Sequence, residues 1–390
     1  MIGIELAIVE IEHQKENVMK NIYTLQQTLA ILTLSLVISF CPTQISAQTY
    51  IAQNSGDWSD PLVWGYRHPD ANSCEKTIII PKGVSINLDK KIELGEQVEL
   101  VINGKLKADE FILNLSHIDL MGNGRINVSE LRADESSLYA FEGKVHVDKA
   151  RLIDNEYAIS STFLVEEELI LMNSTVDLNE GKLKLQNNAK LYMNSSEIDT
   201  INGKLVAVNK TYLYYIGDGG FTGPELRLKG IQSVNISLDN ENASLMLSDH
   251  QSLKMDVIIK VGQLDLNGFN LTTYQMLVCE ENGSIRGDQH SALALGGNSN
   301  LIFVKKNAVL KTLRVGAKNT EVELQTPLLV TQLVDLSYGK IDLNRNVLTV
   351  MGDLRISDFA QVKGNEKKWI KVIDELPVEE FFARQFVYEQ

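Results

Sequence analysis

The sequence predicts an all-β protein, a right-handed parallel β-helix or related β-solenoid, with coils of about 20 residues. Three observations predict this fold: a short phrase that recurs, a nearly constant spacing of its copies, and alternation of apolar and polar residues after each copy. In the phrase, Gly is followed by Lys, Arg, Gln, Ser or Asp and then by Leu, Ile or Val. Copies begin at Gly104, Gly124, Gly143, Gly181, Gly203, Gly262, Gly283, Gly339 and Gly352.

The spacing of these copies favours a coil over an ordinary sheet. The first five copies are separated by 20, 19, 38 and 22 residues, and Gly262 and Gly283 lie 21 residues apart. This period is the length of one turn made of three short strands and three corners. The alternative is an antiparallel β-sandwich, which also alternates but whose strands share no fixed period.

Alternation predicts where the core lies. Apolar residues such as Leu183 and Leu185, two positions apart, place one face of a strand inside the tube and the other face in water. Coils stacked about 4.8 Å apart would pair their backbone N–H and C=O groups with the coils above and below. We expect Gly at the corners because it reaches positive φ without a steric penalty.

Composition narrows the class of protein. The chain has 390 residues and a net charge of −14, which argues against a nucleic-acid partner because a phosphate-binding surface needs a basic patch. Three cysteines, Cys41, Cys74 and Cys279, are too few for a disulfide framework. We expect Cys74 and Cys279 to be free, buried thiols.

Residues 1–47 are typical of a mis-assigned start followed by a signal peptide. Acidic residues in the first 18 positions have the wrong charge for a signal, so we expect translation to begin at Met19. Lys20 and the apolar run Leu29–Phe40 then form the signal, with cleavage before Gln48. The run is too short to span a bilayer, which needs about 20 residues. The mature chain is expected to be secreted or on the outer cell surface; lipid attachment at Cys41 is disfavoured by the bulky Phe40.

The mature N-terminal segment, residues 48–89, is expected to cap the first coil. It contains a GxWxDxxxW phrase followed by an I-x-I-P-x-G-x-x-V-x-L-D-like strand pair. The matching positions are Trp58, Asp60, Trp64, Ile78, Ile80, Pro81, Gly83, Ile86, Leu88 and Asp89. This segment resembles the opening of secreted bacterial surface proteins and of the G8-type domain. The resemblance implies that a β-helix follows and that the protein acts at the cell surface or on polysaccharide.

Two roles are open for the tryptophans of this segment. Trp58 and Trp64 would cover the exposed edge of the first coil, which otherwise invites pairing with other chains. The functional alternative is that both rings stack on sugars. We favour the cap.

The remainder divides into four stretches. Residues 90–211 form a first block of coils and residues 224–363 a second block, while 364–390 form a charged tail or cap. Between the blocks, residues 212–223 read YLYYIGDGGFTG and indicate a Gly-rich loop or junction. Tyr212, Tyr214 and Tyr215 would line a glycan groove there, although alternating Tyr is also typical of half-buried strand packing.

The sequence predicts no catalytic residue, no metal site and no cofactor. Asp177, Asp265 and Asp342 each stand in a [VLI]-D-L-N phrase, but they belong to the repeat and so indicate a solvated face. We therefore expect a non-catalytic β-solenoid that acts as a scaffold, stalk or adhesin, with extracellular polysaccharide or a cell-surface glycan as partner. The alternative is a polysaccharide-binding or polysaccharide-degrading protein of the lyase or glycosidase type. A concave surface where carboxylates of two or more coils converge beside a basic residue would favour it.

Overall fold

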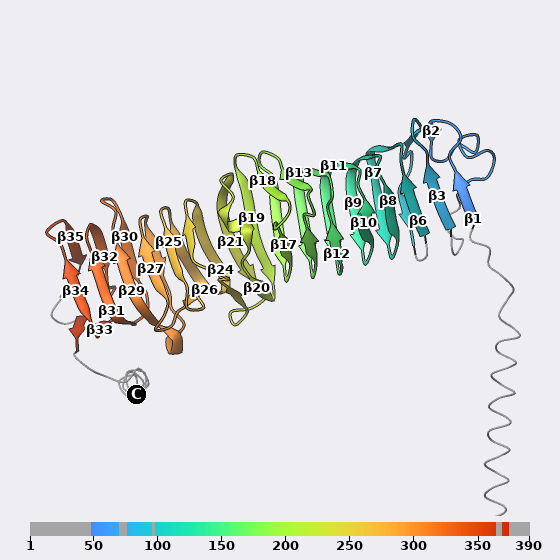
Figure 1. Cartoon of the computed structure of the whole chain (residues 1–390). Coiled ribbons are helices and arrows are strands. Elements are labelled where there is room, and N and C mark those ends of the chain that lie inside the picture. Colours follow the sequence, from blue (N-terminus) through green and yellow to red (C-terminus); the bar gives the residue numbers. More distant parts are fainter. Residues whose placement is uncertain (1–47, 70–75, 96–97, 364–368, 374–390) are drawn as a thin grey trace, which may run out of the picture. The chain divides into compact units, whose positions relative to one another are not determined.

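The computed structural model describes residues 48–69, 76–95, 98–363 and 369–373. In these residues the fold is nearly all β, and parallel strands stack into about 14 turns of a β-solenoid (Figure 1). The predicted fold class is confirmed. The predicted signal peptide, Cys41 and Cys74 lie outside the described residues.

One long sheet runs through the whole described stack. Its strands are β2 (Gly56–Asp57), β4 (Ser85–Asn87), β5 (Ile92–Leu94), β7 (Lys105–Ser116), β9 (Arg125–Asp134), β11 (Lys144–Ile153), β13 (Thr162–Met172), β15 (Lys182–Leu185), β16 (Lys190–Asn194), β18 (Lys204–Ala207), β19 (Thr211–Gly217), β20 (Gly219–Phe221), β21 (Ile231–Leu238), β22 (Ser244–Met246), β24 (Asp256–Asp265), β26 (Leu277–Arg286), β28 (Ser299–Leu301), β30 (Glu321–Leu324), β32 (Gly339–Asp342) and β35 (Ala360–Lys363). Long strands such as β7 and β13 shift register in the middle and so cover two faces of the coil.

The remaining face of the tube is built from three shorter sheets in succession. The first contains β1 (Gln48–Ile51), β3 (Lys76–Ile80), β6 (Val98–Ile102), β8 (Asp119–Gly122) and β10 (Ser137–Phe141). The second contains β12 (Glu156–Ala158), β14 (Thr175–Asp177) and β17 (Glu197–Asp199). The third contains β23 (Gln251–Leu253), β25 (Asn270–Thr273), β27 (Ala292–Leu295), β29 (Val309–Val315), β31 (Leu328–Leu336), β33 (Leu348–Val350), β34 (Asp353–Ile356) and β36 (Ile370–Val372). Two 3-10 helices, η1 (Pro224–Arg227) and η2 (Lys305–Asn307), complete the described elements.

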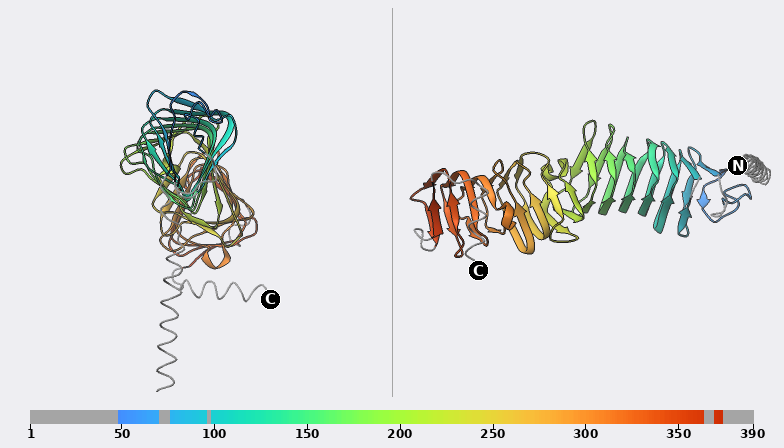
Figure 2. Two further views of the ribbon diagram at one scale, coloured as in Figure 1. Left: turned by 90° about the vertical axis from the view of Figure 1, so that its right-hand side faces the viewer. Right: turned by 90° about the horizontal axis from the view of Figure 1, so that it is seen from below.

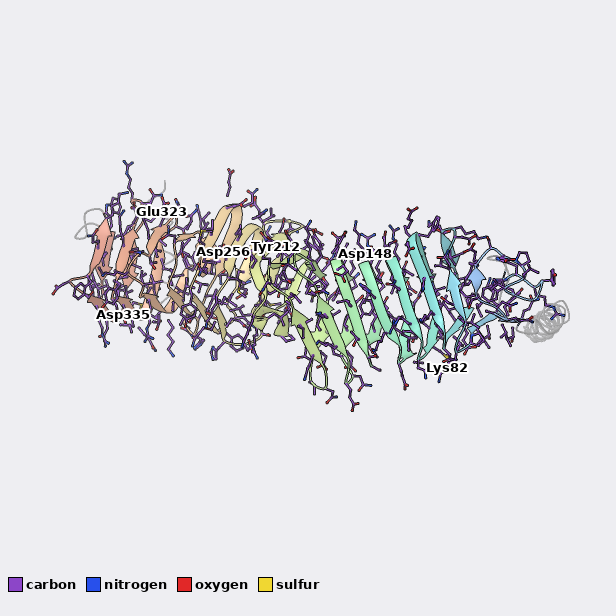
Figure 3. The ribbon with its side chains drawn as sticks, turned by 90° about the horizontal axis from the view of Figure 1, so that it is seen from above. Lys82, Asp148, Tyr212, Asp256, Glu323 and Asp335 are labelled. Carbon is purple, nitrogen blue, oxygen red and sulfur yellow. The ribbon has the colours of Figure 1, made fainter. Side chains whose placement is uncertain are left out.

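The period of the coil follows directly from strand register. Leu106 pairs with Ile126, Ile126 with Val145, and Val145 with Phe163, so equivalent residues return after 18 to 20 positions. All four side chains are buried and stack on one another in the core. Along the described length of the solenoid, other side chains project outward from the strands (Figure 3). Each coil therefore buries its apolar face only by stacking on its neighbours.

The reason for glycine at the corners differs from the expectation. Among the nine copies of the phrase, only Gly262 and Gly339 have positive φ, at 95° and 80°. At Gly124, a Cβ would lie 2.3 Å from the carbonyl oxygen of Gly104, and at Gly143 it would lie 2.4 Å from that of Gly124. Close approach of backbone to the coil before, and not positive φ, therefore requires Gly at these corners.

The tube changes its cross-section between the two predicted blocks. β18 pairs with β15, and no described strand pairs with its other side. A new face begins at β20, which pairs with β22. Seen along the stack, the coils before and after this point do not superimpose (Figure 2). Residues 211–217, however, form the regular strand β19, paired with β16 and β21, so this part is a coil strand and not a loop.

The aspartates of the repeat stabilise corners. Asp265 Oδ1 accepts the Asn267 N–H at 2.8 Å, and Asp342 Oδ1 accepts the Asn344 N–H at 3.0 Å. Both asparagines have positive φ, 49° and 44°. Asp342 also pairs with Lys363 at 2.6 Å, which holds the pKa of its carboxyl below the usual value. These contacts explain the recurrence of Asp-Leu-Asn through turn geometry.

Candidate functional site

The face built from short sheets is interrupted once by a helix. The second sheet ends at β17 and the third begins at β23, and η1 contacts both strands. Pro224 occupies the start of this helix, where a missing N–H costs nothing. Because a short helix cannot continue the ladder of β17, the coil opens at this point.

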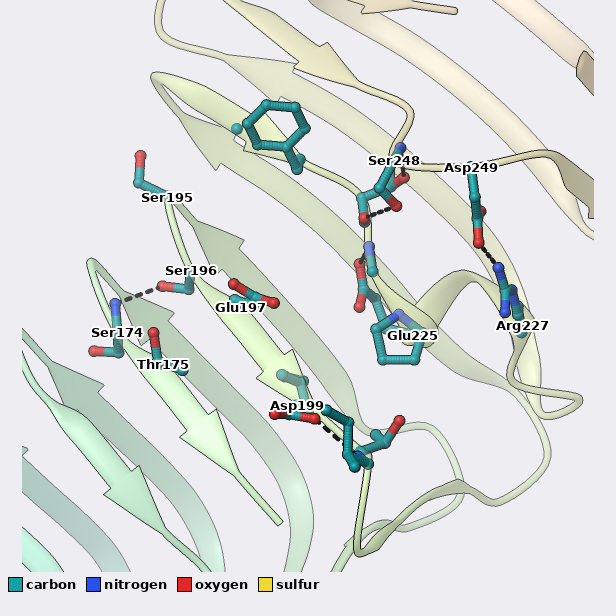
Figure 4. A pocket seen from close by; sticks show the side chains of 18 of the residues that line it. Ser174, Thr175, Ser195, Ser196, Glu197, Asp199, Glu225, Arg227, Ser248 and Asp249 are labelled. Carbon is teal, nitrogen blue, oxygen red and sulfur yellow. Dashed lines mark hydrogen bonds and ion pairs between the residues drawn. The ribbon is translucent and has the colours of Figure 1, made fainter. Parts of the chain in front are cut away.

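This interruption forms a cavity with a volume of about 850 Å³ (Figure 4). Its size falls within the range of about 300–1,000 Å³ that is usual for ligand sites. The polar and aromatic lining residues are Asn173, Ser174, Thr175, Ser195, Ser196, Glu197, Asp199, Thr200, Phe221, Thr222, Glu225, Arg227, Ser248 and Asp249. We call this space the β17–η1 cleft. Carboxylates from several coils line it together with an arginine.

Glu225 is the most unusual residue of the cleft because it is a buried carboxyl with one free oxygen. Only 1% of the residue is exposed. Oε1 accepts hydrogen bonds from the Tyr215 hydroxyl and, at 2.7 Å, from the Gly223 N–H. Oε2 has no partner in the part of the chain that the structure describes. A buried polar atom without a partner carries an unfavourable desolvation free energy.

Burial also changes the ionisation of Glu225. Desolvation raises the pKa of its carboxyl above the usual value of 4.5, and the two hydrogen bonds oppose this shift. The charge of Glu197 adds a smaller upward effect on the same pKa. Figure 4 shows the two carboxyl groups on opposite walls of the cleft. The cleft therefore contains one carboxyl that resists ionisation, that of Glu225, and one exposed carboxyl, that of Glu197.

The other charges of the cleft are partly compensated. Arg227 forms an ion pair with Asp249. Asp199 accepts the Ile201 N–H at 2.8 Å, which fixes its carboxylate at the mouth of the cleft. Neither Glu197 nor Asp199 has an ion-pair partner among the described residues. Hydrogen-bond acceptors thus remain available on the β17 side.

An apolar edge accompanies these polar groups. Phe221 lines the cleft and is 59% exposed, and Ile201, which also lines it, is 85% exposed. Next to Phe221 in the chain, the Thr222 carbonyl accepts a hydrogen bond from the Ser248 hydroxyl at 2.5 Å. A flat aromatic ring can pack against the apolar C–H face of a sugar, and the nearby hydroxyl and carboxylate groups can form hydrogen bonds with the sugar hydroxyls.

The described residues offer no site for a metal ion. No three His, Cys, Asp or Glu side chains in this part of the chain are placed to share one. Glu197, Asp199, Glu225 and Asp249 surround the cleft without converging on one point.

The structure buries Trp58 and Trp64, and Trp58 borders a cavity of about 270 Å³ that His68 and Lys91 also line. Each residue is only 2% exposed, the two ring centroids lie 5.0 Å apart, and Trp64 Nε1 donates to the Trp58 carbonyl at 2.8 Å. Burial of both residues disfavours a sugar platform, and carbohydrate binding by Trp58 and Trp64 stays a prediction. Their burial in the first coils is what a cap requires.

The three tyrosines have different surroundings. Tyr212 and Tyr214 lie half-buried on the outer face of β19, where Tyr214 stacks on Tyr192 at 4.7 Å. Tyr215 points into the core, is 3% exposed and reaches the cleft only through Glu225. None of the three lines the cleft, whereas Gly220 and Phe221, a few residues on, do line it. Glycan binding by the three tyrosines stays a prediction.

Sequence reasoning missed Glu225 and Arg227. The available signal was the phrase GPELRLKG at residues 223–230, in which Pro interrupts the alternation and Glu stands where an inward apolar residue is expected. Glu197 and Asp199 were missed because they occupy ordinary strand positions. Only the neighbouring helix makes them part of a cavity.

Comparisons of the chain with protein-family models, curated proteins and solved structures found no match. The resemblance to G8-type segments stays a prediction. Within the described residues, no helix is both long and apolar enough to cross a bilayer.

Proposed function

We propose that the chain is a non-catalytic β-solenoid that binds a saccharide chain in the β17–η1 cleft. The observation that carries this proposal is the cleft itself, where carboxylates and hydroxyls of neighbouring coils meet an exposed Phe221. A sugar presents many hydroxyl groups together with apolar C–H faces, so it needs acceptors and a flat apolar surface at once. The predicted signal peptide would deliver the site to the cell exterior, where polysaccharides occur.

Binding is favoured over hydrolysis because the buried carboxyl is covered. A glycosidase needs one carboxylic acid that reaches the glycosidic oxygen and one carboxylate opposite it. Glu225 has the raised pKa of such an acid and faces Glu197. Its Oε2, however, is inaccessible to solvent, and a Cβ at Gly223 would lie 2.6 Å from it. The carboxyl therefore supports the wall of the cleft. Hydrolysis is the second candidate because of the opposed carboxyl groups.

A glycan array on the fragment from Gln48 onward tests the proposal, followed by calorimetry with the best oligosaccharide. Asp199→Asn keeps an acceptor for the Ile201 N–H but removes the charge, and Phe221→Ala removes the ring. Each is expected to weaken binding about tenfold, which equals about 1.4 kcal/mol. Asp177→Asn is the matched control, because Asp177 pairs with Asp199 in register but does not line the cleft.

The possible outcomes separate the alternatives. Failure of every glycan to bind, or equal affinity of Asp199→Asn and wild type, would overturn the proposal. Release of reducing ends by the wild type, abolished by Glu225→Gln, would replace it with glycoside hydrolysis.

A further inference from the structure

Five basic residues form a column on the face that begins with β2 and ends with β18. Lys105 pairs in register with Arg125, and Arg125 pairs with Lys144. Thr162 pairs with Lys182, and Lys182 pairs with Lys204. Val145 pairs with Phe163, so the residues that precede them, Lys144 and Thr162, occupy equivalent positions on neighbouring coils. Six consecutive coils thus carry five cations at one place, roughly 4.8 Å apart. We call these five residues the cationic column.

The column is not neutralised by ion pairs with the residues that the structure describes. Lys105, Arg125, Lys144 and Lys204 are exposed and Lys182 is half-exposed. None of the five forms an ion pair with any carboxylate of the described residues, although other basic residues such as Arg132 and Lys149 do. Like charges directly opposite on neighbouring strands destabilise a sheet. Keeping them stacked and unpaired in a chain of net charge −14 is therefore unfavourable for the free protein.

The basic strip is narrow and bounded by acids. Two positions further along the strands, Lys107 and Lys184 add basic charge on two of the coils, while Asn127 and His146 stand there on two others. Exposed carboxylates stand on both sides: Glu142 and Glu180 come two positions before Lys144 and Lys182, and Asp109 and Asp148 come four positions after Lys105 and Lys144. Two residues of extended chain span at most about 7 Å, which is less than the Debye length of about 10 Å at 0.1 M ionic strength. These acids therefore confine the positive potential to a narrow strip, and the edges of the strip repel a broad anion.

We propose that the cationic column is a binding track for a linear acidic polysaccharide lying parallel to the solenoid axis. Uronate or sulfate groups along an extended chain would meet one cation per coil, and weak contacts would add by repetition. The track is separate from the β17–η1 cleft, whose free carboxylates disfavour an anionic ligand.

The basic strip is too narrow for a nucleic-acid duplex, so a linear polysaccharide fits it better. The grooves of B-DNA alone measure about 12 Å and 6 Å across, so a duplex would extend over the acidic edges of the strip. The column also lacks aromatic side chains on which single-stranded bases stack.

Binding of polygalacturonate to the fragment from Gln48 onward tests the track, with dextran as the uncharged polymer and a DNA duplex as the competing anion. The triple variant Arg125→Gln, Lys144→Gln, Lys182→Gln should bind polygalacturonate at least tenfold more weakly. The matched control is Arg132→Gln, Lys149→Gln, Lys340→Gln, which removes the same charge from ion-paired residues and should change affinity less than twofold. Unchanged circular dichroism of both variants shows that they remain folded.

Salt gives an independent readout. Affinity should fall steeply between 0.1 M and 1 M ionic strength, as the Debye length shortens from about 10 Å to about 3 Å. Equal loss in the two triple variants, equal binding of dextran, or tighter binding of the DNA duplex would each overturn the proposal. Failure of the cleft to bind any sugar would leave this result unaffected.

Discussion

The hydroxyl of Tyr215 donates a hydrogen bond to the carboxyl of Glu225 and thereby ties strand β19 to the helix that interrupts the neighbouring face. Both residues are buried, with exposures of 3% and 1%. One hydrogen bond between two inward side chains therefore connects the regular stack to its irregular part. The shape of the cleft depends on this contact.

Tyr215→Phe should lower the free energy of unfolding by about 1–3 kcal/mol, because it leaves the buried Oε1 with the Gly223 N–H alone. Urea unfolding measures the change. Tyr214→Phe, on the outer face of the same strand, is the control and should stay within about 0.5 kcal/mol of wild type. Equal stability of the two variants would contradict the role of the Tyr215–Glu225 contact.

Glu225 should make stability fall as the pH rises. Burial raises the pKa of its carboxyl above the usual 4.5, so the folded state holds the proton where the unfolded state has released it. Its contribution is present below pH 4.5 and is lost as the pH rises through the folded pKa. Glu225→Gln should therefore gain stability relative to wild type across that window, by at most about 1.4 kcal/mol per pH unit. Unfolding from pH 4 to 8, with exposed Glu156→Gln as control, checks it; a flat difference would show that burial of Glu225 does not shift its pKa.

Gly124→Ala should destabilise the first coils by about 1–3 kcal/mol or more, because the added Cβ meets the Gly104 carbonyl oxygen at 2.3 Å. Gly316→Ala provides the comparison, since nothing lies within 4 Å of a Cβ there and its φ is not positive. Thermal unfolding of both variants measures the difference. A Gly316→Ala loss as large as that of Gly124→Ala would mean that close approach to the neighbouring coil is not what requires glycine at the corner.

Cys279 should resist thiol reagents in the native protein. It is 1% exposed, and burial raises the pKa of its thiol to about 12. Little thiolate therefore exists at pH 8, and the reagent has no access to it. Mass spectrometry of the peptide containing Cys279 should find label only after urea treatment. Labelling of the native chain at a rate near that of the unfolded one would show that the coil around Cys279 opens.

The sequence was sufficient to predict the coil but not the cleft. The period between Gly104, Gly124 and Gly143 is a property of the backbone repeat, so it appears directly in the order of residues. The cleft depends on which strand is missing from one face, and a Pro-Glu pair at positions 224 and 225 says nothing of what lies across from it. Register, which only the three-dimensional stack reveals, decides that Glu197 faces Glu225.

The cationic column illustrates the same limit. Its members follow the corner glycines, as in Gly124-Arg125 and Gly143-Lys144, so the recurring phrase already contained them. Sequence reasoning treated that position as merely polar. Pairing with a shift of 18 to 22 residues is what turns scattered basic residues into a continuous strip.

The face that carries the column stops at Ala207, where the cross-section of the tube changes. A polymer lying on it would run out of partners after six coils, however long the polymer is. The end of this face therefore limits the length of polymer that the column can contact. Affinity should rise with oligomer length only until the strip is filled and should then remain constant. The length of the face would thus set the size of the polysaccharide segment that the protein binds.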